Sequence, residues 1–199
     1  MRLLHLSDAH CEHSMLSSVL KREAFRIVVY TGDFECIDIA ELLLEEGGEV
    51  YVVTGELDNP AIYRLLKRES SLLDGLVRDV GDFAVAGVGG LEAVNNVKLL
   101  ENAVSRRSVE KPVVLVSHHP PAGVLDSGSP RIHGGLLEVR RLVERFKPFI
   151  HLFGHVHDSV GVLKQSGALF VNSGSIALGY YALVEVESIA VADARLKRV

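Results

Sequence analysis

Short apolar runs that alternate with stretches of helical periodicity are the feature that most constrains how this 199-residue chain folds. The runs are rich in Val, Ile and Leu, which is typical of strands that are buried on both faces of a sheet. After residue 160 the alternation gives way to strand-like segments joined by short turns. A βαβ half followed by a strand-rich half predicts two sheets packed face to face, with helices on the outside.

The cap residues and the periodicity together place the individual elements. Ser14 is expected to cap one helix, Gly47 and Gly48 to stop another, and Pro60 to begin a third. No linker, repeat or low-complexity tract divides the chain, so residues 1–199 are expected to form one domain. We expect helices at 15–22, 37–46, 60–68, 95–106 and 135–146, and strands at 3–6, 27–30, 49–53, 83–88, 113–117, 148–153, 161–164, 168–172, 180–187 and 189–195.

Composition and charge narrow the class of function. The formal net charge of −5 gives no general attraction to nucleic acid or to an anionic membrane, so neither is expected as a stable partner. No run of about 18 apolar residues occurs, and the first residues lead directly into a motif, which favours a mature cytoplasmic protein. The only cysteines are Cys11 and Cys36; we expect free, buried thiols, with a bridge between their neighbouring loops as the alternative.

Seven side chains of the kinds that ligate metals follow expected strands, each within a few residues of the end of its strand. In α/β folds the carboxyl ends of the strands form the edge at which ligands bind, so five separate loops are expected to converge there. A mixture of carboxylates and imidazoles suits two divalent metals around a phosphate. The seven residues are Asp8, His10, Asp33, Glu56, His118, His155 and His157.

Each of these motifs also has an ordinary structural interpretation when it is taken alone. Asp8 and Asp33 fit polar or glycine turns at strand ends, and a His-x-His pair such as His155 and His157 occurs in ordinary strands. Their common order and strand-end positions favour a binding site over scattered structural residues. For His119, next to His118, we expect a structural or supporting role.

The pattern resembles that of the calcineurin-like metallophosphoesterases, in particular their small single-domain prokaryotic members. The resemblance extends from residue 3 to residue 175 and implies a four-layer α/β/β/α sandwich of two mixed sheets. The matching segments are Asp8-Ala9-His10, Gly32-Asp33, Gly55-Glu56-Leu57-Asp58, His118-His119-Pro120-Pro121, Gly154-His155-Val156-His157 and Asn172-Ser173-Gly174-Ser175.

The resemblance also implies a ligand set and a reaction. The reaction is hydrolysis of a small phosphoester, most readily a phosphodiester, by a hydroxide that bridges two metals. Mixed nitrogen and oxygen ligands favour two divalent ions of Mn, Fe, Zn, Co or Ni over Mg²⁺ or Ca²⁺. By the resemblance, one ion is held by Asp8, His10, Asp33 and His157, and the other by Asp33, Glu56, His118 and His155.

Two residues depart from the family pattern, which usually has Asn at the position of Glu56 and in many members His at the position of Leu57. Asp8, Asp33 and Glu56 contribute three negative charges, which leave a net charge of +1 when two divalent ions are bound. A site with Asn in place of Glu56 would keep a net charge of +2, so the site with Glu56 attracts phosphate less strongly. Alternatively, Glu56 swings away and leaves one metal site weak. Leu57 cannot assist a leaving group, which favours aryl esters or a slower enzyme.

Two further residues are candidates for direct roles in catalysis. His133 precedes an expected helix, and we weigh contact with the substrate evenly against a plain surface position. Asp58 is a candidate for orienting the Glu56 loop or His10.

Three functions remain open from the sequence. The favoured one is a metal-dependent phosphodiesterase. The second is an interaction scaffold on the same fold with weak or no activity, since Glu56 and Leu57 both weaken the usual site. The third is a nuclease subunit, against which the acidic composition argues. The sequence indicates no particular oligomeric state.

Overall fold

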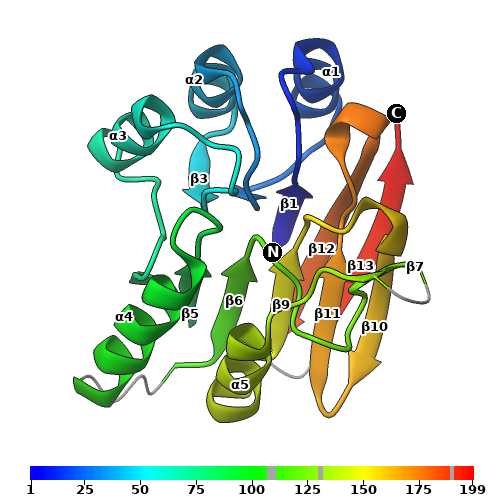
Figure 1. The fold of residues 1–199 in the computed structure, drawn as a ribbon. Coiled ribbons are helices and arrows are strands. Elements are labelled where there is room, and N and C mark those ends of the chain that lie inside the picture. The colour runs from blue at the N-terminus through cyan, green and yellow to red at the C-terminus, as the bar shows by residue number, and fades with distance from the viewer. Residues whose placement is uncertain (107–110, 130–131, 189–190) are drawn as a thin grey trace.

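A computed structural model describes residues 1–106, 111–129, 132–188 and 191–199. It has an α/β architecture in four layers, helices, sheet, sheet and helices, as Figure 1 shows. The expected fold class is therefore confirmed. None of the helices in these residues is long and apolar enough to cross a membrane.

The first sheet has the strand order β13-β12-β1-β2-β3. Strands β1, β2 and β3 are parallel, and β12 and β13 extend the sheet in the antiparallel sense. The register pairs Leu6 with Tyr30 and Tyr30 with Val52, so the three parallel strands end at one level and their loops emerge side by side. The bounds are β1 Arg2–Leu6, β2 Ile27–Tyr30, β3 Glu49–Val52, β12 Tyr180–Ser188 and β13 Val191–Arg198.

The second sheet has the order β10-β11-β9-β6-β5-β4, with antiparallel strands only at its two edges. Its central strands also end near one level, because Val88 pairs with Ser117 and Asn172 with Phe153. The bounds are β4 Val77–Val80, β5 Phe83–Val88, β6 Val113–Ser117, β9 Ile150–Phe153, β10 Gly161–Gln165 and β11 Ala168–Asn172.

Apolar side chains fill the spaces between the four layers. One cluster, which includes Leu3, Val29, Val116 and Leu152, lies between the two sheets. Separate clusters lie beneath the helices on each outer face. The first sheet is covered by α1 His13–Arg22, α2 Ile37–Glu46 and α3 Pro60–Arg68, and the second by α4 Ala93–Arg106 and α5 Leu137–Phe146.

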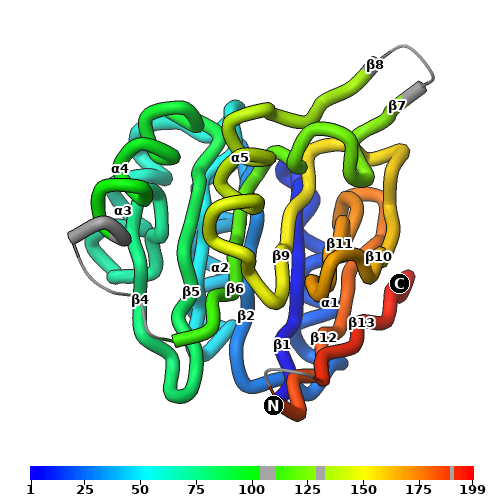
Figure 2. The backbone as a smooth tube through the Cα atoms, turned by 90° about the horizontal axis from the view of Figure 1, so that it is seen from below, coloured from blue at the N-terminus to red at the C-terminus, as the bar shows by residue number. Residues whose placement is uncertain are grey.

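Smaller elements lie near the strand ends. A hairpin of β7 (Ser127–Ser129) and β8 (Ile132–His133) extends beyond the sandwich in Figure 2. The 3-10 helix η1 (His157–Ser159) contacts this hairpin, because Ser159 Oγ donates to the Ser127 carbonyl at 2.7 Å. A second 3-10 helix, η2, spans Ile176–Leu178.

The sequence expectations differ from the structure at several boundaries. Helix α1 begins earlier than expected and its cap is Glu12, whose carboxylate accepts a hydrogen bond from the Ser14 amide at 3.1 Å, so the expectation of Ser14 as the cap is wrong. The short strands β4, β7 and β8 were not expected. Of the strand expected at 189–195, residues 189 and 190 lie outside the described residues.

The two cysteines also differ from expectation. Cys11 and Cys36 form a disulfide with their Cα atoms 5.1 Å apart, and Cys11 is exposed, so the expectation of free, buried thiols is wrong. The loops that follow β1 and β2 lie side by side because their strands are parallel neighbours. This closeness, which the sequence only suggested, brings the two sulfurs within bonding distance.

Candidate metal centre

The seven expected ligands converge where the two sheets meet. They come from the loops after β1, β2, β3, β6 and β9, and they fall into three overlapping groups. Within each group the candidate ligand atoms all lie within 4.8 Å of one another. The groups are Asp8 with His10 and His157, Glu56 with His118 and His155, and Asp8 with Asp33 and His118.

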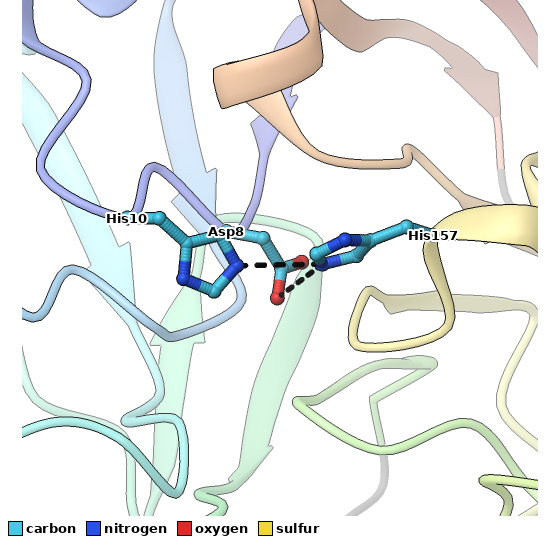
Figure 3. Close-up of side chains that lie close together, drawn as sticks. All are labelled: Asp8, His10 and His157. Atoms are coloured by element: carbon cyan, nitrogen blue, oxygen red, sulfur yellow. Dashed lines mark hydrogen bonds and ion pairs between the residues drawn. The ribbon is translucent and has the colours of Figure 1, made fainter.

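The first group is shown in Figure 3. His10 and His157 face one another from opposite sides of the Asp8 carboxylate, with their Nε2 atoms 3.5 Å apart. His157 Nε2 lies 3.3 Å from Asp8 Oδ1. Two imidazole nitrogens and a carboxylate oxygen that point at a common space are a ligand arrangement for a transition metal.

The second group is centred on Glu56. Its Oε2 lies 2.6 Å from His118 Nε2, and its Oε1 lies 2.8 Å from His155 Nδ1. His119 is farther away, with its Nε2 3.7 Å from Glu56 Oε2, and its ring packs against that of His155 at 4.4 Å between centroids. His119 therefore lies behind the group, in the supporting position expected of it.

Asp33 connects the two groups. Its Oδ2 lies 3.5 Å from His118 Nε2, and its Oδ1 accepts a hydrogen bond from the Leu57 amide at 2.9 Å. Asp8, Asp33 and His118 are all buried and form the floor, whereas the remaining candidate ligands are partly or more fully exposed. The centre is thus a continuous set of ligand atoms with a buried floor and an accessible rim.

Several residues around the centre have backbone conformations that are unfavourable for residues other than glycine. Asp8, His10, Asp33 and His155 have φ values of 57°, 45°, 59° and 67°, in the left-handed region. For a residue other than glycine this conformation costs about 1 kcal/mol or more, and such residues cluster at functional sites. Close contact adds a second constraint, because a Cβ at Gly154 would collide with Ser7 Oγ beside Asp8.

Burial and charge act on the second group together. Burial alone would raise the pKa of Glu56, but the close approach of the His118 and His155 imidazoles holds that pKa far below its usual range. Burial opposes protonation of His118, yet its closeness to Glu56 and the charges of Asp8 and Asp33 raise its pKa to about 10. The pairing thus favours the ionised form of the carboxylate and the protonated form of the imidazole.

The pKa values of the two carboxyl groups in the floor shift in opposite directions. Burial raises the pKa of Asp33 to about 6, in spite of the nearby His118. For Asp8 the cost of burial is outweighed by the close approach of the His157 imidazole, which lowers the pKa of the carboxyl, and the pKa of His157 is raised in turn. Crowded carboxylates of this kind are stabilised when a cation is bound between them.

Two orphaned atoms test whether a metal fits. Among the described residues, Asp8 Oδ1 and His118 Nε2 are buried and have no hydrogen-bond partner, although each lies close to another candidate ligand. Atoms that lie close together without hydrogen-bond geometry have the arrangement of ligands that point at a common ion. A buried polar atom without a partner is costly, and coordination removes that cost. The donor set therefore fits divalent metals.

Supporting contacts orient the ligand histidines. His118 Nδ1 donates to the Thr31 carbonyl at 2.6 Å, and His10 Nδ1 donates to Glu35 Oε1 at 2.7 Å. Each contact leaves Nε2 free to coordinate. Ser175 Oγ donates to the Asp8 carbonyl at 2.7 Å and fixes that loop from η2. Glu35 and Thr31 were not expected at the site, because neither lies in a motif that would identify it from the sequence.

Asp58 is buried and makes four hydrogen bonds to the backbone. Its Oδ1 accepts from the amides of Phe34 and Glu35 at 2.7 and 3.1 Å. Its Oδ2 accepts from the amides of Asp33 and Gly55 at 3.2 and 2.8 Å. It therefore holds the Asp33 loop against the Gly55–Glu56 turn, and the orienting role expected of it stays a prediction.

His133 lies on the hairpin at the rim of the centre. Its side chain is 58% exposed, and its Nδ1 lies 3.2 Å from Asp126 Oδ1. The next residue, Gly134, is close to a candidate ligand, because a Cβ there would come within 3.2 Å of His155 Cδ2. His133 is thus neither among the ligands nor remote from them.

Comparison with known proteins agrees with this arrangement. The family model of the calcineurin-like phosphoesterase superfamily domain matches residues 1–194. A segment of 69 residues, 34% of this chain, is 32% identical to metallophosphoesterase domain-containing protein 1 of Homo sapiens. The matched segment is 21% of the human protein, so the chain spans about a fifth of the length of this curated relative.

Solved structures share the fold at low sequence identity. A protein from Thermus thermophilus superposes with a TM-score of 0.71 and 16% identity, over 99% of this chain and 98% of that one. A structure described as an archaeal phosphodiesterase superposes with a TM-score of 0.62 and 12% identity, over 99% of this chain and all of that one (100%). At these identities the likeness establishes the fold.

Replacing Asp58 tests its positioning role. In Asp58→Asn the amide group keeps one acceptor oxygen and turns its NH₂ toward two backbone donors, so about two hydrogen bonds are lost. Each unsatisfied buried group costs about 1–3 kcal/mol. We expect a lower melting temperature and weaker Mn²⁺ binding in calorimetry. The exposed Asp82→Asn should change neither, and unaltered Mn²⁺ affinity in Asp58→Asn would contradict the role.

Proposed function

This chain belongs to the calcineurin-like phosphoesterase superfamily, and we propose that within it the chain is a metal-dependent phosphodiesterase whose centre holds two divalent cations. The observation that carries the proposal is the continuity of the ligand set. Asp33 shares a group with Asp8 and His118, which belong to the two other groups, so a carboxylate lies where two cations would share a ligand.

In the proposed assignment, Asp8, His10 and His157 would hold one cation, Glu56, His118 and His155 would hold the other, and Asp33 would contribute to both sites. When bound, such a pair of cations lowers the pKa of a water between them and neutralises charge on the phosphoryl oxygens. The buried floor fixes the ligands, while the more exposed rim leaves one side open to a substrate. Manganese, iron, zinc, cobalt and nickel all suit these donors.

The residues around the centre favour diesters with good leaving groups. Leu57 is 54% exposed beside Asp33, whose carboxylate accepts a hydrogen bond from the Leu57 amide. An aliphatic side chain there supplies no proton to a departing alkoxide, so leaving groups that depart as stable anions react most readily. The structural neighbour described as an archaeal phosphodiesterase supports the choice of a diester.

A second candidate function is an interaction scaffold with little or no activity. The observation that favours it is the position of Glu56, whose two oxygens already pair with His118 and His155. If that pairing persisted in the presence of metal, the second cation would have no complete site. Measurement of bound metal distinguishes this candidate from the phosphodiesterase.

The proposal is tested by metal analysis and turnover on the same preparation. The protein should bind two equivalents of Mn²⁺ in calorimetry and hydrolyse bis(p-nitrophenyl) phosphate faster than p-nitrophenyl phosphate. Asp33→Asn should abolish turnover, because the ligand common to both cations is weakened. Absence of both binding and turnover would reject the phosphodiesterase in favour of the scaffold, and faster monoester hydrolysis would reject the diester preference.

Replacing Glu56 tests its effect on the second cation. Glu56→Asn removes one negative charge from the centre and breaks the ion pair with His118, which frees the imidazole to coordinate. We expect higher occupancy of the second site or faster diester hydrolysis, by about tenfold, the change that corresponds to ~1.4 kcal/mol. Metal stoichiometry and turnover measured across a Mn²⁺ titration check this. If both match the parent protein, the effect assigned to Glu56 is wrong.

Replacing His133 tests its contact with substrate. If its imidazole donates one hydrogen bond to the phosphoester, His133→Ala should raise KM by about tenfold, as expected for a contact of ~1.5 kcal/mol, while metal stoichiometry is unchanged. The exposed His13, at the first position of α1, provides a matched control as His13→Ala. Equal KM values in the two variants would place His133 in a plain surface loop.

A further inference from the structure

The loops after β1 and β2 lie side by side and are joined as a short ladder. The amides of Asp8, His10 and Cys11 donate to the carbonyls of Gly32, Asp33 and Phe34, at 2.9, 3.2 and 3.1 Å. The Cys11–Cys36 disulfide closes the end of this ladder. Three candidate ligands, Asp8, His10 and Asp33, are therefore presented by two loops that one covalent bond holds together.

The ladder is built from unfavourable backbone conformations. Five of its residues other than glycine have positive φ: Asp8, His10, Cys11, Asp33 and Glu35. Such a concentration persists only where surrounding contacts overdetermine the conformation. The contacts here are the three backbone hydrogen bonds between the loops, the His10–Glu35 pair, the hydrogen bonds of Asp58 and Ser175, and the disulfide. Of these, the disulfide is the one that a redox reaction can remove.

The disulfide lies close in sequence to two of the candidate ligands. Cys11 follows His10 directly, and Cys36 is three residues after Asp33. Cys36 is also the N-cap residue of α2, and its side chain makes no capping bond there. Cys11 is exposed and Cys36 half-buried, so the bond is open to attack by a thiolate from solvent.

We propose that Cys11 and Cys36 are positioning residues whose disulfide clamps the two loops of the first metal site, so that its reduction weakens metal binding reversibly. The inference rests on the metal centre of the proposed function, and it adds redox control to that centre. In the oxidised form the covalent bond holds the loop of Asp8 and His10 against the loop of Asp33. In the reduced form the strained residues are free to relax, and the ligands of the first site move apart.

The reductant is a dithiol, and the reaction balances. One thiolate of the dithiol attacks the exposed Cys11 sulfur, the Cys11–Cys36 bond breaks, and Cys36 leaves as a thiolate. The second thiol of the reductant then attacks the reductant's own sulfur in the mixed disulfide. Cys11 leaves as a thiolate, and the reductant becomes an intramolecular disulfide. Two electrons and two protons pass from the dithiol to the protein, and a disulfide oxidant reverses the exchange.

The effect should differ between the two cations. The loops in question supply Asp8, His10 and Asp33, whereas Glu56, His118 and His155 come from loops that the disulfide does not join. Reduction should therefore raise the Mn²⁺ dissociation constant of the first site by about tenfold, which is the usual effect of losing a contact that orients metal ligands. The dissociation constant of the second site should change less. Mn²⁺ is the suitable probe because free thiolates bind it poorly.

The test is calorimetric Mn²⁺ titration of the full chain in three states: oxidised, reduced with dithiothreitol that is then removed under nitrogen, and reoxidised. Mass spectrometry after thiol labelling records the state of the cysteines, and circular dichroism confirms that the reduced protein is folded. The Cys11→Ser/Cys36→Ser double variant is the matched control. It should bind Mn²⁺ as weakly as the reduced protein and show no response to dithiothreitol.

The outcomes separate this inference from the proposed function. If the oxidised protein binds two Mn²⁺ and reduction leaves both constants unchanged, the clamp is rejected and the metal centre stands. If dithiothreitol does not reduce the bond in the folded protein, redox control is rejected. If the oxidised protein binds no Mn²⁺, the metal centre and the clamp fall together. The clamp is supported if reduction weakens binding, reoxidation restores it, and the double variant binds weakly in both conditions.

Discussion

The position of the Asp33 carboxylate is the constraint on which the rest of the centre depends. It lies between two groups of ligands, each of which combines side chains from loops of both sheets, and its residue has a left-handed backbone conformation that needs support from its neighbours. Asp58 supports that loop by accepting from three of its amides, and the Asp8 loop supports it through the ladder. The fold supplies this support because parallel strands in both sheets end at one level.

Charge explains why these side chains lie close together. Three carboxylates and several imidazoles occupy one small region and form pairs such as Glu56 with His118 and Asp8 with His157. These pairs involve the same atoms that would coordinate a metal, so pairing and coordination compete. The competition is strongest at Glu56, which offers two oxygens to two histidines. A cation must displace protons from these histidines, so metal binding is coupled to proton release.

Much of this arrangement could be predicted from the sequence, and the reasons for the exceptions are physical. Strands such as Ile27–Tyr30 and helices such as Pro60–Arg68 follow from apolar runs and cap residues, and the family resemblance is confirmed across residues 1–194. Strand β7, of sequence Ser-Gly-Ser, has no strand propensity and exists only through its pairing with β8. The disulfide and the His10–Glu35 contact depend on which loops are neighbours, which only the assembled sheet decides. The ligand roles of the seven residues, and the roles of His133 and Asp58, stay predictions.

The most direct measurement is a crystal structure of the protein soaked with Mn²⁺ and phosphate, with the anomalous signal of manganese recorded. We expect two anomalous peaks on either side of the Asp33 carboxylate, one coordinated by Asp8, His10 and His157 and the other by Glu56, His118 and His155, with phosphate oxygens between them. No peak at these residues, or a Glu56 side chain still paired with His118 beside an empty second position, would contradict it.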